Sequence, residues 1–218
     1  MLTNKYFTRP LLIGAFLLAG ASVQAQMTEQ TDSQRSDAVH TCTTCHGSDG
    51  RGNPVVRAPG LDGRESWYIR RQLENFRAGV RGTQKSYTSG LEMHAAASVL
   101  DDEAIDRIIN AIEDWRPVPR HEGINGDAAR GQQLYNNCAA CHGLDGQGIE
   151  AVGAPALAGK SDWYLMNQLR LFKSGYRGTH PGDPAGAQMR AMTQNLDVDG
   201  TLKDVVAYIR TMGVADIE

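Results

Sequence analysis

Apolar residues recur at three- and four-residue intervals in four stretches of the chain, and this period predicts amphipathic helices. The four stretches are 69–76, 105–112, 165–172 and 202–209. A fifth helix is expected to begin after Asp127, a residue type that favours the N-terminal cap, and to run into Cys138. The alternation of apolar and polar residues that is typical of β-strands does not persist, so we predict an all-α fold.

This pattern occurs twice along the chain. A shift of 96 residues places 42–100 on 138–196 without a gap, and the offset becomes 97 in the last helix. A repeat of this length indicates a duplicated domain. We therefore predict two domains, 26–116 and 126–218, joined by a linker at 117–125 that contains proline and glycine.

The most specific repeated motif is Cys-x-x-Cys-His-Gly. The chain carries it as Cys42, Cys45 and His46 and again as Cys138, Cys141 and His142. Cys-x-x-Cys-His is the local pattern for attachment of c-type heme, in which both thiols form thioethers with the porphyrin. The adjacent histidine then binds the iron as its proximal ligand. The sequence therefore predicts two covalently bound heme c groups.

A Cys-x-x-Cys pair also occurs in thioredoxin-like redox motifs and in zinc sites. The redox motif does not require the histidine, and it belongs in a strand–helix context that this sequence lacks. A zinc site would need further ligands, yet the two motifs already contain all four cysteines of the chain. We therefore favour heme attachment.

A second ligand is expected on the other face of each iron. Of the seven methionines, only Met93 and Met189 are related by the repeat, and each follows a glycine in a segment that we expect to be a loop. A thioether is a soft ligand, and histidine–methionine ligation raises the reduction potential of heme iron. The competing interpretation is that both methionines fill gaps in the core. His94 and Met192 are alternative ligands in the first and second domains.

Two further sets of repeated residues have both a heme-related and a structural interpretation. They are Trp67, Tyr68, Trp163 and Tyr164, and Arg81 and Arg177. The aromatic N–H and O–H groups can reach heme propionates, and core packing accounts for them equally well. The arginines can pair with propionates, although solvation at the surface is the default expectation for them.

The first 25 residues have the features of a secretory signal peptide. Lys5 and Arg9 precede a short apolar run, and small residues lead up to Ala25, after which we expect cleavage. A membrane anchor is the alternative, but the apolar run has only about half of the roughly 20 residues that span a bilayer. Attachment of c-type heme takes place outside the cytoplasm, so we predict a periplasmic protein.

With these motifs, the chain resembles class I c-type cytochromes, specifically the small periplasmic diheme cytochromes of the c-four type. The shared motifs are Cys-x-x-Cys-His-Gly-x-Asp-Gly, Ala-Pro-x-Leu, an aromatic-led Gln-Leu-x-x-Phe helix and the methionine-to-leucine spacing. The resemblance implies two tandem class I cytochrome c domains about a pseudo-twofold axis, with hemes close enough for rapid electron exchange. It also implies that the carbonyls of Pro59 and Pro155 accept a hydrogen bond from the proximal histidines and so orient the imidazoles.

A six-coordinate iron has no open position for a substrate, so we expect electron transfer. We predict a one-electron carrier, not an enzyme, that links a quinol-oxidising complex to a terminal oxidase or reductase of the respiratory chain. One alternative is a cytochrome subunit of a periplasmic dehydrogenase complex. Another is a diheme enzyme such as a thiosulfate dehydrogenase or a peroxidase.

The expected partners are therefore other redox proteins. The net charge of the 218 residues is −3, which gives no electrostatic case for binding nucleic acid. We expect a monomer that docks transiently at the membrane surface, where its electron donors and acceptors lie.

Overall fold

The structure is a computed structural model that describes residues 39–113, 115–117, 123–197 and 200–212. Its helices are α2 (Ser66–Arg77), α3 (Thr88–Ala97), α4 (Asp102–Ile112), α5 (Ala128–His142), the 3-10 helix η1 (Glu150–Val152), α6 (Asp162–Lys173), α7 (Pro184–Thr193) and α8 (Thr201–Ile209). Residues 39–46 are also helical. The described residues contain two isolated β-bridges and no strand, so the all-α prediction is confirmed. The predicted signal peptide, 1–25, lies outside them.

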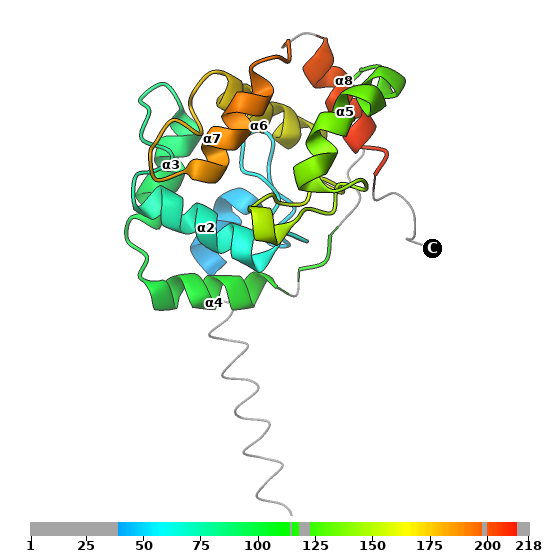
Figure 1. The fold of residues 1–218 in the computed structure, drawn as a ribbon. Helices are drawn as coiled ribbons and strands as arrows, with labels where there is room; N and C mark the ends of the chain where they lie inside the picture. The colour runs from blue at the N-terminus through cyan, green and yellow to red at the C-terminus, as the bar shows by residue number, and fades with distance from the viewer. Residues whose placement is uncertain (1–38, 114, 118–122, 198–199, 213–218) are drawn as a thin grey trace, which may run out of the picture.

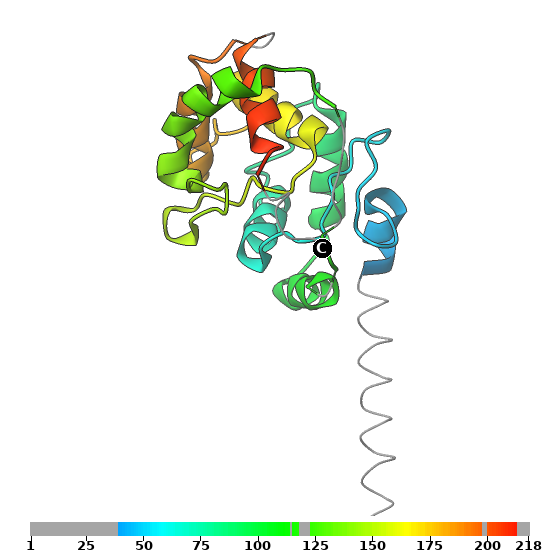
Figure 2. The same ribbon diagram turned by 90° about the vertical axis from the view of Figure 1, so that its right-hand side faces the viewer.

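Two helical units lie side by side, one for each copy of the repeat (Figure 1). In the first unit, α2 packs against α3 and α4. In the second, α6 packs against α7 and α8, and α5 packs along α8. The turned view shows the helical residues 39–46 at the outer side of the first unit (Figure 2). No helix in the described part of the chain has the length and hydropathy needed to cross a bilayer.

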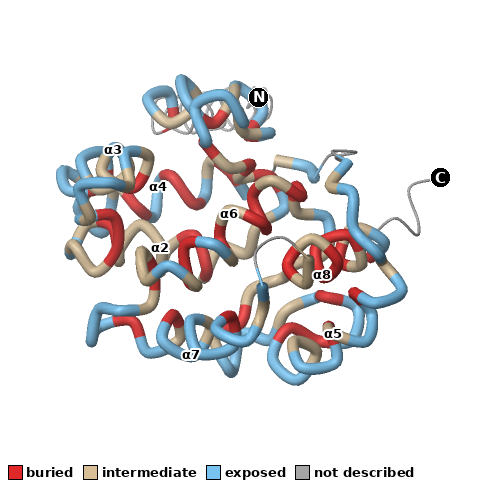
Figure 3. Tube along the Cα trace, turned by 90° about the horizontal axis from the view of Figure 1, so that it is seen from above, coloured by how far each residue is buried: buried red, intermediate tan, exposed pale blue. Residues whose placement is uncertain are grey.

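Each unit has its own apolar core, and the predicted stripes form it. The first core consists of Val39, Ile69, Ile105, Ile108, Ile109 and Ile112. The second consists of Tyr135, Tyr164, Leu165, Val205, Val206, Ile209 and Met212. Buried positions gather on the inward faces of the helices, and exposed positions on the outward faces (Figure 3). The three-four spacing thus identified the buried faces of α4 and α8 correctly.

Helix ends also follow from single residues. The side chains of Asp101 and Asp127 each accept a hydrogen bond from the backbone N–H three residues later, at 2.7 and 3.0 Å. These bonds satisfy N–H groups that have no partner within the helix. Helices α2 and α6 end just before Gly79 and Gly175, whose φ angles are +69° and +80°. A residue with a side chain rarely adopts this left-handed conformation, so both glycines end their helices.

The prediction of loops around Met93 and Met189 is wrong, because both methionines lie in helices, α3 and α7. Only two of the ten residues in each helix are buried, so neither sequence shows an apolar stripe. Helix α7 is instead specified by its first residues. The Asp183 side chain accepts a hydrogen bond from the backbone N–H of Gly186, and Pro184 occupies the first helical turn.

Helices α5 and α8 touch closely at Gly131, where a Cβ atom would overlap the carbonyl oxygen of Asp204. Gly131→Ala should therefore lower the free energy of unfolding by about 1–3 kcal/mol, because the added methyl group pushes the two helices apart. Gly123→Ala is the matched control, since no heavy atom lies within 4 Å of a Cβ atom at that position. Thermal unfolding measures both variants, and equal stability of the two would contradict this packing.

Candidate heme sites

Each Cys-x-x-Cys-His motif ends a helix, and its histidine is held by a distant carbonyl. His142 is the last residue of α5, and His46 is the last of the helical residues 39–46. The Nδ1–H group of His46 donates to the carbonyl oxygen of Pro59, and that of His142 to the carbonyl oxygen of Pro155, each at 2.7 Å. A carbonyl can only accept, so the proton is on Nδ1 and the lone pair of Nε2 is free to bind a metal. The two hydrogen bonds that the resemblance implies are confirmed.

The two imidazoles have different electrostatic surroundings. Burial lowers the pKa of both, which leaves them neutral at pH 7, and the hydrogen bond to proline partly offsets this by raising the pKa. Beside His142, the carboxylate of Glu65 raises the pKa further. Beside His46, the guanidinium of Arg64 lowers it. The second-unit histidine thus has a negative neighbour and the first-unit histidine a positive one.

The cysteines of each motif differ in burial. Cys42 and Cys138 lie partly buried against the cores of their units, whereas Cys45 and Cys141 are exposed. Burial raises the pKa of the Cys42 thiol and raises that of Cys138 to about 11. All four thiols are free, so each motif has two sulfur atoms available for covalent attachment.

A cavity of about 430 Å³ opens beside the second-unit motif. Cys138, Cys141 and His142 border it, and so does Met189. Much of the remaining wall is apolar and consists of Leu134, Leu157, Leu165, Leu169, Phe172, Val205 and Ile209. The structure therefore brings the four predicted second-unit site residues together around one apolar space. The repeat places Cys42, Cys45, His46 and Met93 at the equivalent positions of the first unit.

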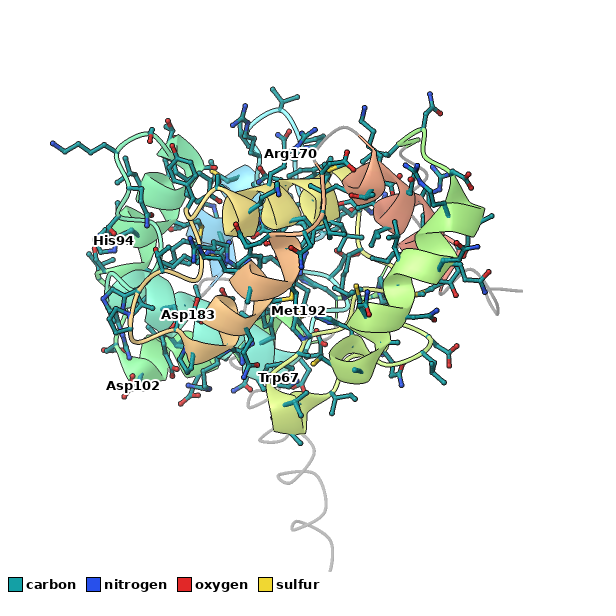
Figure 4. The ribbon with its side chains drawn as sticks, turned by 45° about the horizontal axis from the view of Figure 1, so that its top comes forward. Trp67, His94, Asp102, Arg170, Asp183 and Met192 are labelled. Atoms are coloured by element: carbon teal, nitrogen blue, oxygen red, sulfur yellow. The ribbon has the colours of Figure 1, made fainter. Side chains whose placement is uncertain are left out.

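In the second unit, the alternative ligand Met192 is more exposed than the paired methionine Met189. Met93 and Met189 are partly buried, whereas Met192 is 48% exposed, although it borders the same cavity. Met192 lies near the C-terminal end of α7, and Asp183 is the N-terminal cap of the same helix (Figure 4). The Nδ1–H group of His94 donates to the carbonyl oxygen of Phe76 at 2.5 Å. This bond ties His94 to the C-terminal end of α2, and it leaves Nε2 free as in His46 and His142.

The repeated arginines meet at the interface between the two units. Arg81 donates to the side-chain oxygens of Gln72, at 2.6 Å, and Gln168, at 3.0 Å. Arg177 donates to the same two oxygens, that of Gln168 at 2.5 Å and that of Gln72 at 3.1 Å. Both arginines are buried, only 7% and 6% exposed, so the expectation of solvated surface arginines is wrong. Only the packing of the two units reveals this, because a repeated arginine looks the same in sequence whether it is buried or exposed.

These buried charges have no carboxylate against them among the described hydrogen bonds. The acceptors are neutral amides, and the Nε–H groups of Arg81 and Arg177 have no acceptor in the described part of the chain. Burial raises the pKa of the nearby Tyr68 hydroxyl, but Arg177, Arg81 and Arg64 outweigh it and lower that pKa to about 7. The electrostatic potential at the interface is therefore positive, and it favours a bound anion.

The second-unit cavity extends to this interface, because first-unit residues form part of its wall. Arg64, Tyr68, Arg71 and Gln72 border it together with Arg177. Arg64, Arg71 and their neighbour Glu65 were not among the site residues that the sequence predicts. None of the three is identical in the other copy of the repeat, and repetition was the signal that selected candidates.

Comparison with known proteins gives a consistent result over both units. The sequence model of the family described as Cytochrome c matches residues 36–113 and 128–213. A thiosulfate dehydrogenase electron acceptor from Stutzerimonas stutzeri (strain A1501) is 32% identical over 216 residues, which cover 92% of this chain and 93% of that protein.

Solved structures are also similar to this chain. Cytochrome c4 from Acidithiobacillus ferrooxidans has a TM-score of 0.65 at 28% identity, over 80% of this chain and 99% of that one. The thiosulfate dehydrogenase TsdBA from Marichromatium purpuratum, in its as-isolated form, has a TM-score of 0.63 at 31% identity, over 81% of this chain. The match spans only 37% of the TsdBA chain.

The residues around the cavity fit heme c. Two thiols and an imidazole with a free Nε2 lie at its border, and its wall is more apolar than polar. The buried guanidiniums of Arg81 and Arg177 would supply positive charge for the propionate carboxylates of heme. The apolar wall thus suits the faces of the porphyrin, the thiols suit its covalent attachment, and the guanidiniums suit its acidic edge.

Arg177→Met should lower the reduction potential of the second-unit heme, because a buried cation favours the state that carries the extra electron. We expect the free energy of one-electron reduction of this heme to become less favourable by about 1–2 kcal/mol. Arg170→Met is the matched control, since it removes the same charge from an exposed position on α6 (Figure 4). Optical redox titration measures both variants, and equal potentials in the two would contradict the influence of the buried charge.

Proposed function

Because the chain belongs to the cytochrome c family and is a diheme electron carrier, we propose that each of its hemes is held between a histidine and a methionine. The first-unit ligands are His46 and Met93, and the second-unit ligands are His142 and Met189. Heme iron bound in this way supplies reversible one-electron chemistry. The observation that carries the proposal is the cavity that His142 and Met189 border together with both motif cysteines.

The residues of the chain divide the work. The cysteines fix the porphyrin edge, and the carbonyl of Pro155 or Pro59 orients the imidazole and increases its basicity. Met189 and Met93 would complete the coordination of the iron and leave it no open position for water or a substrate. With the thiols bound to heme and the iron coordinated on both faces, the site would offer no reactive position, so we propose that the protein transfers electrons and catalyses no other reaction.

Electrons can pass between the two units across their shared interface. Side chains of the first unit border the second-unit cavity, and Arg81 and Arg177 bind glutamines of both units. These contacts hold the two cofactor sites in one fixed geometry. We propose that one heme receives the electron from the donor and the other delivers it.

We propose that this carrier works in the periplasm after cleavage of 1–25, with 26–116 and 126–218 as its domains. Its donor is a quinol-oxidising complex at the membrane surface, and its acceptor is a terminal oxidase or reductase. A second candidate has specific support: one relative covered almost completely is named a thiosulfate dehydrogenase electron acceptor. In that case the donor is a periplasmic thiosulfate dehydrogenase.

The two donors are distinguished by mixing the oxidised carrier with each of them. Stopped-flow absorbance follows reduction by a thiosulfate dehydrogenase with thiosulfate, and separately by quinol-oxidising membranes with quinol. If only one donor system reduces the carrier faster than that system turns over in steady state, that system is the physiological donor. Failure with both would contradict both candidates.

Met189→Ala should abolish the weak far-red ferric band of one heme and lower the potential of that heme, because the thioether favours ferrous iron. The opened iron should then bind carbon monoxide when reduced, whereas the unaltered protein should not. Met93→Ala should do the same to the other heme. Met192→Ala is the matched control on the same helix, and a loss of the band in that variant instead of Met189→Ala would overturn the ligand assignment.

A further inference from the structure

The two units are related by a repeat, but the contacts that cross their interface near the histidines are not symmetric. Glu65 of the first unit corresponds to Ser161 of the second, and Arg71 corresponds to Asn167. The first unit thus has a carboxylate and a guanidinium where the second has neutral side chains. Both charged groups reach the second unit close to the loop that holds His142.

The carboxylate contacts the peptide group that orients this histidine. Oε1 of Glu65 accepts a hydrogen bond from the backbone N–H of Ala156 at 2.5 Å. That N–H belongs to the same peptide unit as the carbonyl of Pro155, which accepts the Nδ1–H of His142 at 2.7 Å. The result is a continuous chain from carboxylate through peptide to imidazole.

The surrounding contacts keep this chain in place. Glu65 precedes α2 directly, yet its side chain makes no capping bond to that helix and crosses the interface instead. Arg71, on α2, donates to the carbonyl oxygen of Gly153 at 2.7 Å. Its guanidinium lies over the rings of Trp67 and Tyr68, 4.9 and 5.5 Å from their centroids. The second-unit loop is therefore held at Gly153 and at Ala156, on both sides of Pro155, and η1 lies beside α2 (Figure 1).

The carboxylate is poorly solvated, which strengthens its effect. Oε2 of Glu65 is buried and has no hydrogen-bond donor among the described residues. In such surroundings the negative charge acts more strongly on the one N–H group that it binds. Hydrogen bonds in a chain polarise one another, so the Pro155 carbonyl becomes a better acceptor and the His142 imidazole a stronger electron donor.

We propose that Glu65 is a positioning residue of the first unit that acts through the Pro155–Ala156 peptide on His142 and lowers the reduction potential of the second-unit heme. The inference rests on the proposed function in one respect, namely that His142 binds the iron. A more basic imidazole stabilises ferric iron over ferrous iron. Since Ser161 carries no charge, the first-unit heme has no such partner at the equivalent position, and the interface makes the two hemes inequivalent.

Glu65→Gln tests this with little change of shape. The amide oxygen can still accept the Ala156 N–H, and Arg64 and Arg71 remain, so only the negative charge is lost. In a redox titration, the reduced-to-oxidised ratio of the second-unit heme at a fixed potential should rise roughly tenfold. The first-unit heme should not change. Met189→Ala identifies which titration step belongs to the second unit, and Glu74→Gln, on α2, is the matched charge control.

A second measurement needs no variant. In the NMR spectrum of the reduced unaltered protein, the Nδ1–H resonance of His142 should lie downfield of that of His46, because its hydrogen bond is the stronger one. In Glu65→Gln the His142 resonance should move upfield, while that of His46 stays in place.

The outcomes are distinct. If both titration steps shift equally in Glu65→Gln, or neither shifts while both hemes keep the far-red band, the role of Glu65 is overturned and the proposed function stands. Equal Nδ1–H resonances in the unaltered protein would also overturn it. If the unaltered protein lacks histidine–methionine ligation at the second heme, the proposed function itself fails.

Discussion

The hydrogen bond from each motif histidine to a proline carbonyl thirteen residues later is the contact on which both candidate sites depend. It places the proton on Nδ1 and leaves Nε2 free, so that a buried neutral imidazole becomes a metal ligand of fixed orientation. It also connects the helix that carries the cysteines to the loop that follows them. Without it, His46 and His142 would be two buried histidines with no defined direction.

The interface between the units links the two sites through shared contacts. Arg81 and Arg177 are buried there on two glutamine oxygens, and residues of the first unit border the cavity of the second. Buried charges are costly, and nearby anions offset that cost. The propionate groups of two bound hemes would provide further anions. Cofactor binding and the association of the units should therefore stabilise each other.

Periodicity and repetition predicted most of the fold. The isoleucines of α4 and the cap at Asp127 lie where the pattern predicted them, because burial and capping leave local traces in sequence. The helices around Met93 and Met189 were not predicted, because each has only two buried residues and no apolar stripe. Repetition selected the cysteines, histidines and methionines, whereas Glu65 and Arg71 act across the interface and have no repeated counterpart. Contacts that depend on how two units pack cannot be found from the repeat within one of them.

The most direct test of this account is the proton NMR spectrum of the reduced holoprotein, in which both irons are diamagnetic. A methionine that binds heme iron lies over the porphyrin ring, and the ring current moves its methyl resonance far upfield. We predict two such methyl resonances, lost one at a time in Met93→Ala and Met189→Ala. A spectrum with none, or one in which these substitutions leave both resonances in place, would contradict the histidine–methionine sites.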